Sequence, residues 1–266
     1  MLTLSTSVGD CLTMSLLKSI GLTGGRAQAL IRAAAALVLG AHLAIGNAKA
    51  DDVVFGYYDE FTLYFEDEGG LKDEILLVFH GFGSAMPNGA YRSLHNKYAE
   101  RYSIIGFNYD YFDLTANDTI MDAVWDQILK DKSVTFAGTS LGGFWANYYA
   151  EKFGVPKVFA VNPVIDPVQQ LRQFVGTITV EKRNKTVLVT ETDIDNYIGR
   201  KARPSPDIER LIILTRDDKI LDYRLAEDWY DVSGTELVIL DDGGHTLNLR
   251  EERYEPIIKP FLLGED

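Results

Sequence analysis

The chain has 266 residues and a formal net charge of −13, with 46% hydrophobic and 24% charged residues. A single hydrophobic core can grow to about 250–300 residues before chains usually divide, so we expect one globular domain. The acidic balance disfavours nucleic acid and anionic lipid as partners, because like charges repel. The only cysteine, Cys11, excludes an intrachain disulfide and a cysteine-based metal site.

The first fifty residues carry four basic groups and one acid, a net charge of +3, which leaves −16 on the rest of the chain. Arg26 and Arg32 precede a mainly apolar run at residues 33–45, and Ala48-Lys49-Ala50 follows it. These are the three parts of a secretory signal peptide, and the run is shorter than the roughly 20 residues of a membrane span. We predict cleavage after Ala50 and a periplasmic or secreted protein without a membrane span. The alternative is an uncleaved leader on a cytoplasmic protein.

In residues 51–266, apolar runs of strand length alternate with segments of helical spacing. The expected strands are 62–65, 75–79, 103–107, 133–137, 157–161, 211–214 and 236–240. The expected helices are 90–101, 120–129, 141–153, 225–230 and 252–263, the last constrained by Pro256 and Pro260. This alternation predicts an α/β fold with a mainly parallel, doubly wound sheet and helices on both faces.

Residues 164–209 break this rhythm with several prolines and a polar stretch. Residues 168–175 are expected to form a short helix, and residues 186–190 have the composition of a strand. We interpret the whole segment as a short cap insertion that partly covers the site described next.

Gly138-Thr139-Ser140-Leu141-Gly142 fits the pattern G-x-S-x-G. The expected strand 133–137 leads straight into it and a helical segment follows at once, which is the setting of a nucleophile elbow. A sharp turn there exposes the serine hydroxyl, and glycines are needed because strand and helix approach closely. The pattern therefore predicts Ser140 as a nucleophile.

A second glycine-rich loop, His80-Gly81-Phe82-Gly83-Ser84, follows the apolar strand 75–79. An oxyanion hole takes one backbone N–H from the residue after the nucleophile and one from a loop of this kind. We therefore predict that the N–H groups of Leu141 and Phe82 bind the oxyanion. His80 is expected to shape the loop by hydrogen bonding.

A serine nucleophile needs a base and an acid to form a catalytic triad, and both are expected near the end of the chain. His245 follows the last expected strand, and histidine is the best base near neutral pH. His95 lies within an expected helix and is predicted to be a surface residue. Asp217 and Asp218 follow strand 211–214, and the order Ser, Asp, His is typical of one hydrolase architecture. Asp218 is the preferred acid, Asp217 is the alternative, and Asp166 is a remote third candidate.

Aromatic and sulfur-containing side chains near these loops are candidates for an acyl pocket. The predicted lining residues are Phe82, Met86, Tyr109 and Phe112. Phe144, Trp145 and Tyr149 have helical spacing and are expected in the core. The sequence has no metal-binding or dinucleotide-binding motif, so no metal and no cofactor is expected.

These motifs make the chain resemble the YqiA/YcfP-like esterases of the α/β-hydrolase superfamily. The resemblance covers roughly residues 74–264. It rests on His80-Gly81-Phe82, Gly138 to Gly143, Val161-Asn162-Pro163, Asp218 with Leu221-Asp222-Tyr223-Arg224, and Gly243-Gly244-His245. It implies the α/β-hydrolase fold, esterase activity on short-chain esters, and Asp218 as the triad acid. The leader and an additional strand near residues 53–65 depart from the group.

The residues and the resemblance together predict a serine hydrolase that acts on a small-molecule ester through an acyl-serine intermediate. A thioesterase, peptidase or acyltransferase would use the same triad, so these alternatives stay open. A non-catalytic binding protein with this fold is a remote alternative. The oligomeric state is not predicted.

Overall fold

The computed structural model describes residues 54–58, 61–66, 70–180, 185–201 and 203–264. The expected signal peptide, its cleavage site after Ala50 and Cys11 lie outside these residues, so they stay predictions. In the part of the chain that is described, no helix is long and apolar enough to cross a membrane.

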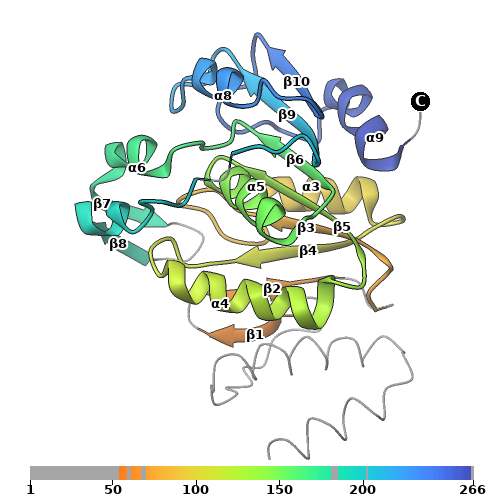
Figure 1. The fold of residues 1–266 in the computed structure, drawn as a ribbon, viewed down its shortest axis with the longest axis horizontal. Coiled ribbons are helices and arrows are strands. Elements are labelled where there is room, and N and C mark those ends of the chain that lie inside the picture. The colour runs from red at the N-terminus through yellow and green to blue at the C-terminus, as the bar shows by residue number, and fades with distance from the viewer. Residues whose placement is uncertain (1–53, 59–60, 67–69, 181–184, 202, 265–266) are drawn as a thin grey trace, which may run out of the picture.

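The centre of the molecule is an eight-stranded sheet with strand order β1-β2-β4-β3-β5-β6-β9-β10 (Figure 1). The strands are β1 (Val54–Tyr58), β2 (Phe61–Tyr64), β3 (Glu74–Phe79), β4 (Ser103–Asn108), β5 (Ser133–Thr139), β6 (Lys157–Val161), β9 (Glu209–Thr215) and β10 (Thr235–Leu240). β2 pairs antiparallel with β1 and β4, and every other pairing is parallel. The predicted mainly parallel α/β fold is therefore confirmed.

Helices cover both faces of this sheet. The α-helices of the described residues are α3 (Gly89–Tyr98), α4 (Leu114–Val124), α5 (Leu141–Phe153), α6 (Pro167–Gln170), α7 (Glu191–Asp195), α8 (Tyr223–Trp229) and α9 (Glu255–Leu263). Buried residues of α4, α5 and α8 belong to the hydrophobic cluster on one face, and those of α3 and α9 belong to the cluster on the other. The parallel sheet is thus shielded from water on both sides, as such sheets require.

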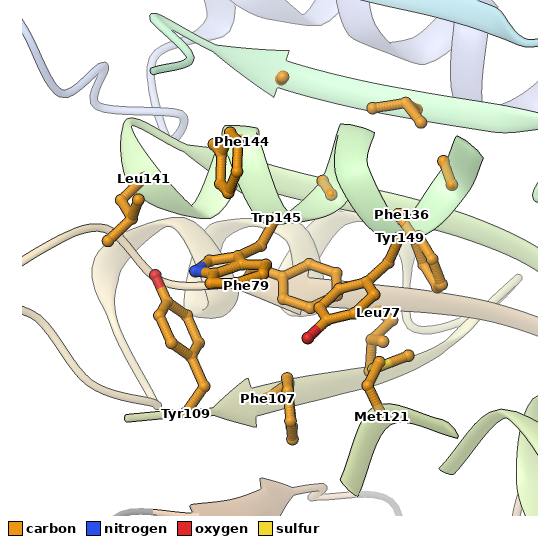
Figure 2. Close-up of a cluster of buried hydrophobic side chains, with 14 of the residues drawn as sticks. Leu77, Phe79, Phe107, Tyr109, Met121, Phe136, Leu141, Phe144, Trp145 and Tyr149 are labelled. Carbon is orange, nitrogen blue, oxygen red and sulfur yellow. The ribbon is translucent and has the colours of Figure 1, made fainter. Parts of the chain in front are cut away.

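The alternation of side chains along β3 shows how the two clusters arise. Ile75, Leu77 and Phe79 point to the face of α5, whereas Leu76 and Val78 point to the face of α3. Figure 2 shows Phe79 beside Trp145 and Tyr149 of α5, in the cluster that also holds Phe136 of β5. Fully burying a side chain of this size contributes about 1.5–3 kcal/mol, so these rings hold α5 firmly against β3 and β5.

Four of the five expected helices differ from their expected bounds, and α4 differs most. The helix expected from residue 120 begins at Leu114, because the Asp113 carboxylate accepts a hydrogen bond from the N–H of Ala116 and caps it. It continues beyond Val124 as a π-helical turn, Trp125–Leu129. In α9, Pro256 occupies the first turn. A proline fits there because the N–H groups of the first turn have no acceptor within the helix.

Segment 164–209 contains more regular structure than expected. After α6, a 3₁₀ turn (Arg172–Phe174) leads into the hairpin of β7 (Gly176–Val180) and β8 (Lys185–Val189). β8 matches the expected strand 186–190, whereas β7 and α7 were not expected. Figure 1 places α6, β7 and β8 beyond the end of the sheet to which the arrowhead of β4 points. The segment therefore lies on the side where the parallel strands end.

Candidate active site

Ser140 lies between β5 and α5 with a strained backbone. Its φ is 58° and its ψ is −125°, which is rare for a residue with a side chain. Its N–H donates to the carbonyl of Val161 at 3.0 Å, and its own carbonyl accepts from the N–H groups of Phe144 and Val164 at 3.2 and 3.1 Å. Such a conformation costs about 1–3 kcal/mol and persists only where the surroundings hold it.

Two glycines are needed for this turn. A Cβ placed on Gly138 would lie 2.2 Å from the carbonyl oxygen of Gly142. A Cβ placed on Gly142 would lie 2.2 Å from the carbonyl oxygen of Phe79, at the end of β3. No side chain fits either position, which agrees with the close approach of strand and helix expected from the sequence.

The loop after β3 lies against this turn. A Cβ on Gly81 would be 3.4 Å from Ser140 Cβ and 4.0 Å from Ser140 Oγ. Among the described residues, none accepts a hydrogen bond from the backbone N–H of Phe82 or of Leu141. Leu141 is the first residue of α5, where the helix dipole favours negative charge. Leu141 directly follows Ser140 and Phe82 directly follows Gly81, so two backbone donors flank this turn.

Two tyrosine hydroxyls hold the loop on either side of Phe82. Tyr109 Oη donates to the carbonyl of His80 at 2.6 Å, and Tyr111 Oη donates to the carbonyl of Ser84 at 2.5 Å. The His80 ring is fully buried and stacks on the Tyr109 ring, with the centroids 4.2 Å apart. Its Nε2 accepts from the N–H of Tyr109 at 3.4 Å, so Nδ1 carries the proton toward the Gly81 carbonyl at 2.9 Å. His80 thus lies where the sequence predicted, as part of the loop structure.

The predicted pocket residues have different surroundings. Tyr109 is only 1% exposed and packs within the core cluster (Figure 2), and its role as a pocket residue stays a prediction. Met86 is buried over Gly106 of β4 in the cluster on the α3 face, which also makes it a packing residue. Phe112 is half-buried, 6.1 Å from the Phe82 ring, and lines an open cavity of about 530 Å³ at the start of α4. Of these three predicted lining residues, Phe112 lies beside the Phe82 ring.

His245 and Asp218 are in contact. His245 Nδ1 lies 2.8 Å from Asp218 Oδ2, and the Asp218 side chain is 1% exposed. Asp218 Oδ1 accepts from the N–H groups of Ile220 and Leu221 at 2.7 and 3.1 Å. Burial by itself would raise the pKa of Asp218, but the hydrogen bonds from His245 and the two N–H groups outweigh it and hold the pKa below its ordinary value. The carboxylate therefore stays ionised beside the imidazole.

The two adjacent aspartates have different partners. Asp217 accepts from the N–H groups of Gly243 and Gly244, at 3.3 and 2.8 Å, and so holds the backbone of the histidine loop. Asp218 holds the imidazole itself. Asp166, the third candidate, caps α6 and forms an ion pair with Lys201. The geometry therefore favours Asp218 as the partner of His245.

His95, expected at the surface, is half-buried, with Nδ1 3.6 Å from Glu66 Oε2. No group of three or more His, Cys, Asp or Glu side chains in the described ranges is arranged to hold a metal ion.

The contacts of Tyr111 and Thr215 with these loops were not predicted from the sequence. Thr215 ends β9, and its Oγ1 donates to the carbonyl of Gly244 at 2.8 Å. No local pattern marks either residue, because each acts on a loop 27 or more positions away.

Comparison with known proteins agrees with this architecture. The uncharacterised protein family UPF0227 matches residues 75–262. The alpha/beta hydrolase domain-containing protein 10 from mouse superposes with a TM-score of 0.60 at 13% identity, over 81% of this chain and 98% of that one. A thermophilic esterase from Thermogutta terrifontis superposes with a TM-score of 0.52 at 16% identity, over 77% and 94% of the two chains. Est1E from Butyrivibrio proteoclasticus gives 0.56 at 13% identity, over 81% and 98%. At these identities the likeness establishes the α/β-hydrolase fold.

Proposed function

Since this chain belongs to the protein family UPF0227, the YqiA/YcfP-like esterase group of the α/β-hydrolase superfamily, we propose that it hydrolyses carboxylic esters through an acyl-serine intermediate on Ser140. The observation that carries the proposal is the 2.8 Å contact between His245 Nδ1 and the buried carboxylate of Asp218. A carboxylate in this position keeps the proton of the imidazole on Nδ1 and leaves Nε2 free to accept one.

In the proposed reaction, Ser140 Oγ attacks the ester carbonyl carbon while His245 Nε2 takes the hydroxyl proton. The carbonyl oxygen becomes negative and accepts hydrogen bonds from the N–H groups of Phe82 and Leu141, each worth about 2.7–4 kcal/mol in the transition state. The ester C–O bond breaks, and the alcohol leaves with the proton from His245. Water then attacks the acyl-serine with His245 as base, and the acid is released. Asp218 stays ionised and stabilises the imidazolium at each step.

We further propose that the substrate has a short acyl chain, because segment 164–209 reaches over the loops of the site. The Phe174 ring lies 5.1 Å from the Phe82 ring, and Gln173 Nε2 donates to the carbonyl of Ile220 at 3.4 Å. Residues 173 and 174 thus touch both the loop of Phe82 and the loop of Asp218. A segment that crosses between these loops limits the room for a long chain. A series of p-nitrophenyl esters is expected to give its highest kcat/KM well below about ten carbons, and a maximum above that length would contradict this part of the proposal.

The main test compares hydrolysis of p-nitrophenyl butyrate by the wild type and by Ser140→Ala. Loss of a triad serine lowers kcat by about 10⁴–10⁶. Ser93→Ala is the matched control, because Ser93 is also a buried serine but lies in α3, where its Oγ donates to the carbonyl of Gly89. Equal activity of wild type and Ser140→Ala would refute the proposed nucleophile. A thioester or an amide cleaved faster than the butyrate ester, still with dependence on Ser140, would keep the mechanism and change the substrate class.

A further inference from the structure

Asn162 has an unusual backbone at the end of β6. Its φ is 40°, and its side chain is buried, with the residue only 2% exposed. It precedes Pro163, and a residue before proline normally adopts an extended conformation. A conformation of this kind persists only where the surrounding structure holds it, and such positions concentrate at functional sites.

The side-chain amide of Asn162 joins two loops of the candidate active site. Its Oδ1 accepts from the N–H of Thr215 at 2.9 Å. Its Nδ2 lies 3.0 Å from the carbonyl oxygens of both Gly244 and His245, and 3.2 Å from Thr215 Oγ1. The Thr215 N–H can only donate and the two carbonyls can only accept, so this orientation of the amide is the one that the partners allow.

The neighbours of Asn162 contact the third loop. The carbonyl of Val161 accepts from the N–H of Ser140 at 3.0 Å, and the N–H of Val164 donates to the carbonyl of Ser140 at 3.1 Å. The N–H of Asn162 itself donates to the carbonyl of Ile213 in β9 at 2.8 Å. One short segment around Asn162 is therefore bonded to Ser140, to the end of β9 three residues before Asp218, and to His245.

We propose that Asn162 is a positioning residue, which sets the place of the His245 imidazole relative to Ser140 and Asp218. This inference rests on the proposed function, since it assumes that these three residues react together. Asn162 reaches the backbone of His245 and not its ring, so it acts by fixing the loop. A displacement of about 1 Å in a catalytic group costs about 10²-fold in rate, so an amide that fixes this loop has a large effect on kcat.

Two variants separate the side chain of Asn162 from its backbone. Asn162→Asp keeps an acceptor for Thr215 but turns an oxygen toward the carbonyls of Gly244 and His245, which repels the histidine loop. Asn162→Gly adopts positive φ without strain and lacks every side-chain contact. Both variants are expected to lower kcat for p-nitrophenyl butyrate by about 10²-fold with KM changed less than about 3-fold. For Asn162→Asp the ratio of its kcat to that of the wild type is expected to rise as the pH falls, because a protonated carboxyl can again donate to these carbonyls.

Asn117→Asp is the matched control for a buried asparagine that only supports a loop. Asn117 is 1% exposed, and its amide bonds among the described residues only to the backbone of Asp110, at 2.7 and 3.2 Å. Asn117→Asp is expected to lose about as much thermal stability as Asn162→Asp. It is expected to keep the wild-type ratio of kcat to KM and the wild-type pH profile. Wild-type kcat in Asn162→Gly, or an equal loss of kcat in Asn117→Asp, would overturn the inference.

A second measurement decides the inference even if the proposed function fails. The Nδ1 proton of His245 bonded to Asp218 is expected as a low-field proton NMR signal, assigned by its loss in His245→Gln. This signal is expected to broaden or vanish in Asn162→Asp and to persist in Asn117→Asp. An unchanged signal in Asn162→Asp would refute the positioning role. Activity that survives in Ser140→Ala would refute the proposed function without affecting this readout.

Discussion

Replacing each of the two adjacent aspartates by asparagine tests the geometry of the site most directly. In Asp218→Asn, the side-chain oxygen can still accept from the N–H groups of Ile220 and Leu221, so the loop keeps its shape. The new NH₂ group then faces His245 Nδ1, which lay 2.8 Å from the carboxylate. That nitrogen must become the acceptor, and the imidazole proton moves to Nε2. The base would then hold a proton where it must accept one.

The expected loss follows from this change of tautomer. The equivalent substitution in triad enzymes lowers kcat by about 10⁴, which corresponds to about 5.5 kcal/mol at 1.36 kcal/mol for each factor of ten. Asp217→Asn keeps an oxygen for the N–H of Gly244 at 2.8 Å and loses the longer contact with Gly243 at 3.3 Å. A hydrogen bond to a charged group is worth about 1.5–3 kcal/mol and this long one falls at the lower end, so kcat is expected to fall about 10-fold.

The assay is the pH dependence of kcat and kcat/KM for p-nitrophenyl butyrate in the wild type and both variants. Thermal unfolding of each protein shows that the comparison is made on folded enzyme. A loss in Asp217→Asn equal to or greater than that in Asp218→Asn would refute the assignment of Asp218, and with it the reasoning from the 2.8 Å contact.

Three further predictions concern stability and the loop of Phe82. The folded-state pKa of Asp218 lies below its ordinary value. Burial raises this pKa, but the hydrogen bonds to the carboxylate lower it more. Its stabilising effect is therefore complete above the unfolded pKa of about 3.9 and disappears as the pH falls through the folded pKa. Urea unfolding is expected to give a difference between wild type and Asp218→Asn that shrinks below about pH 4, and a difference independent of pH would contradict this. Glu151→Gln removes the ionic partner of Arg210, which is 0% exposed, and is expected to cost about 3 kcal/mol in the free energy of unfolding measured with urea. A loss below about 1 kcal/mol would mean that the remaining partners of Arg210 suffice. Tyr111→Phe removes a hydroxyl that holds the loop of Phe82 and is expected to lower the free energy of unfolding by about 1 kcal/mol. It is also expected to lower kcat with KM unchanged, and wild-type kcat would show that the loop does not need this anchor.

Much of the fold could be predicted from local sequence. The apolar runs at 75–79 and 133–137 became β3 and β5, because a strand buried on both faces has few alternatives for such residues. The start of α4 was not predicted, because its first turns contain Leu114 among polar residues and lack apolar periodicity. The hairpin of β7 and β8 depends on pairing between strands, which no single run reveals.

The candidate site divides in the same way. Ser140 could be located because its glycines, strand and helix are its neighbours in sequence, and His245 because few histidines compete with it. Asp218 and Asp217 are chemically identical, so only their directions in the folded loop distinguish them. Their catalytic roles remain predictions that the variants above test.

The sequence by itself determined where the strands, the elbow and the glycine-rich loops begin, because these depend on residues within one turn or one strand of each other. Only the tertiary structure decided that Tyr109 is a core residue whose hydroxyl holds the loop of His80, 29 positions away. It also decided that Asn162 bonds to the loop of His245, 83 positions away. Such contacts form only when the sheet brings the ends of separate strands together. The local sequence around each residue does not show which strand ends will be neighbours.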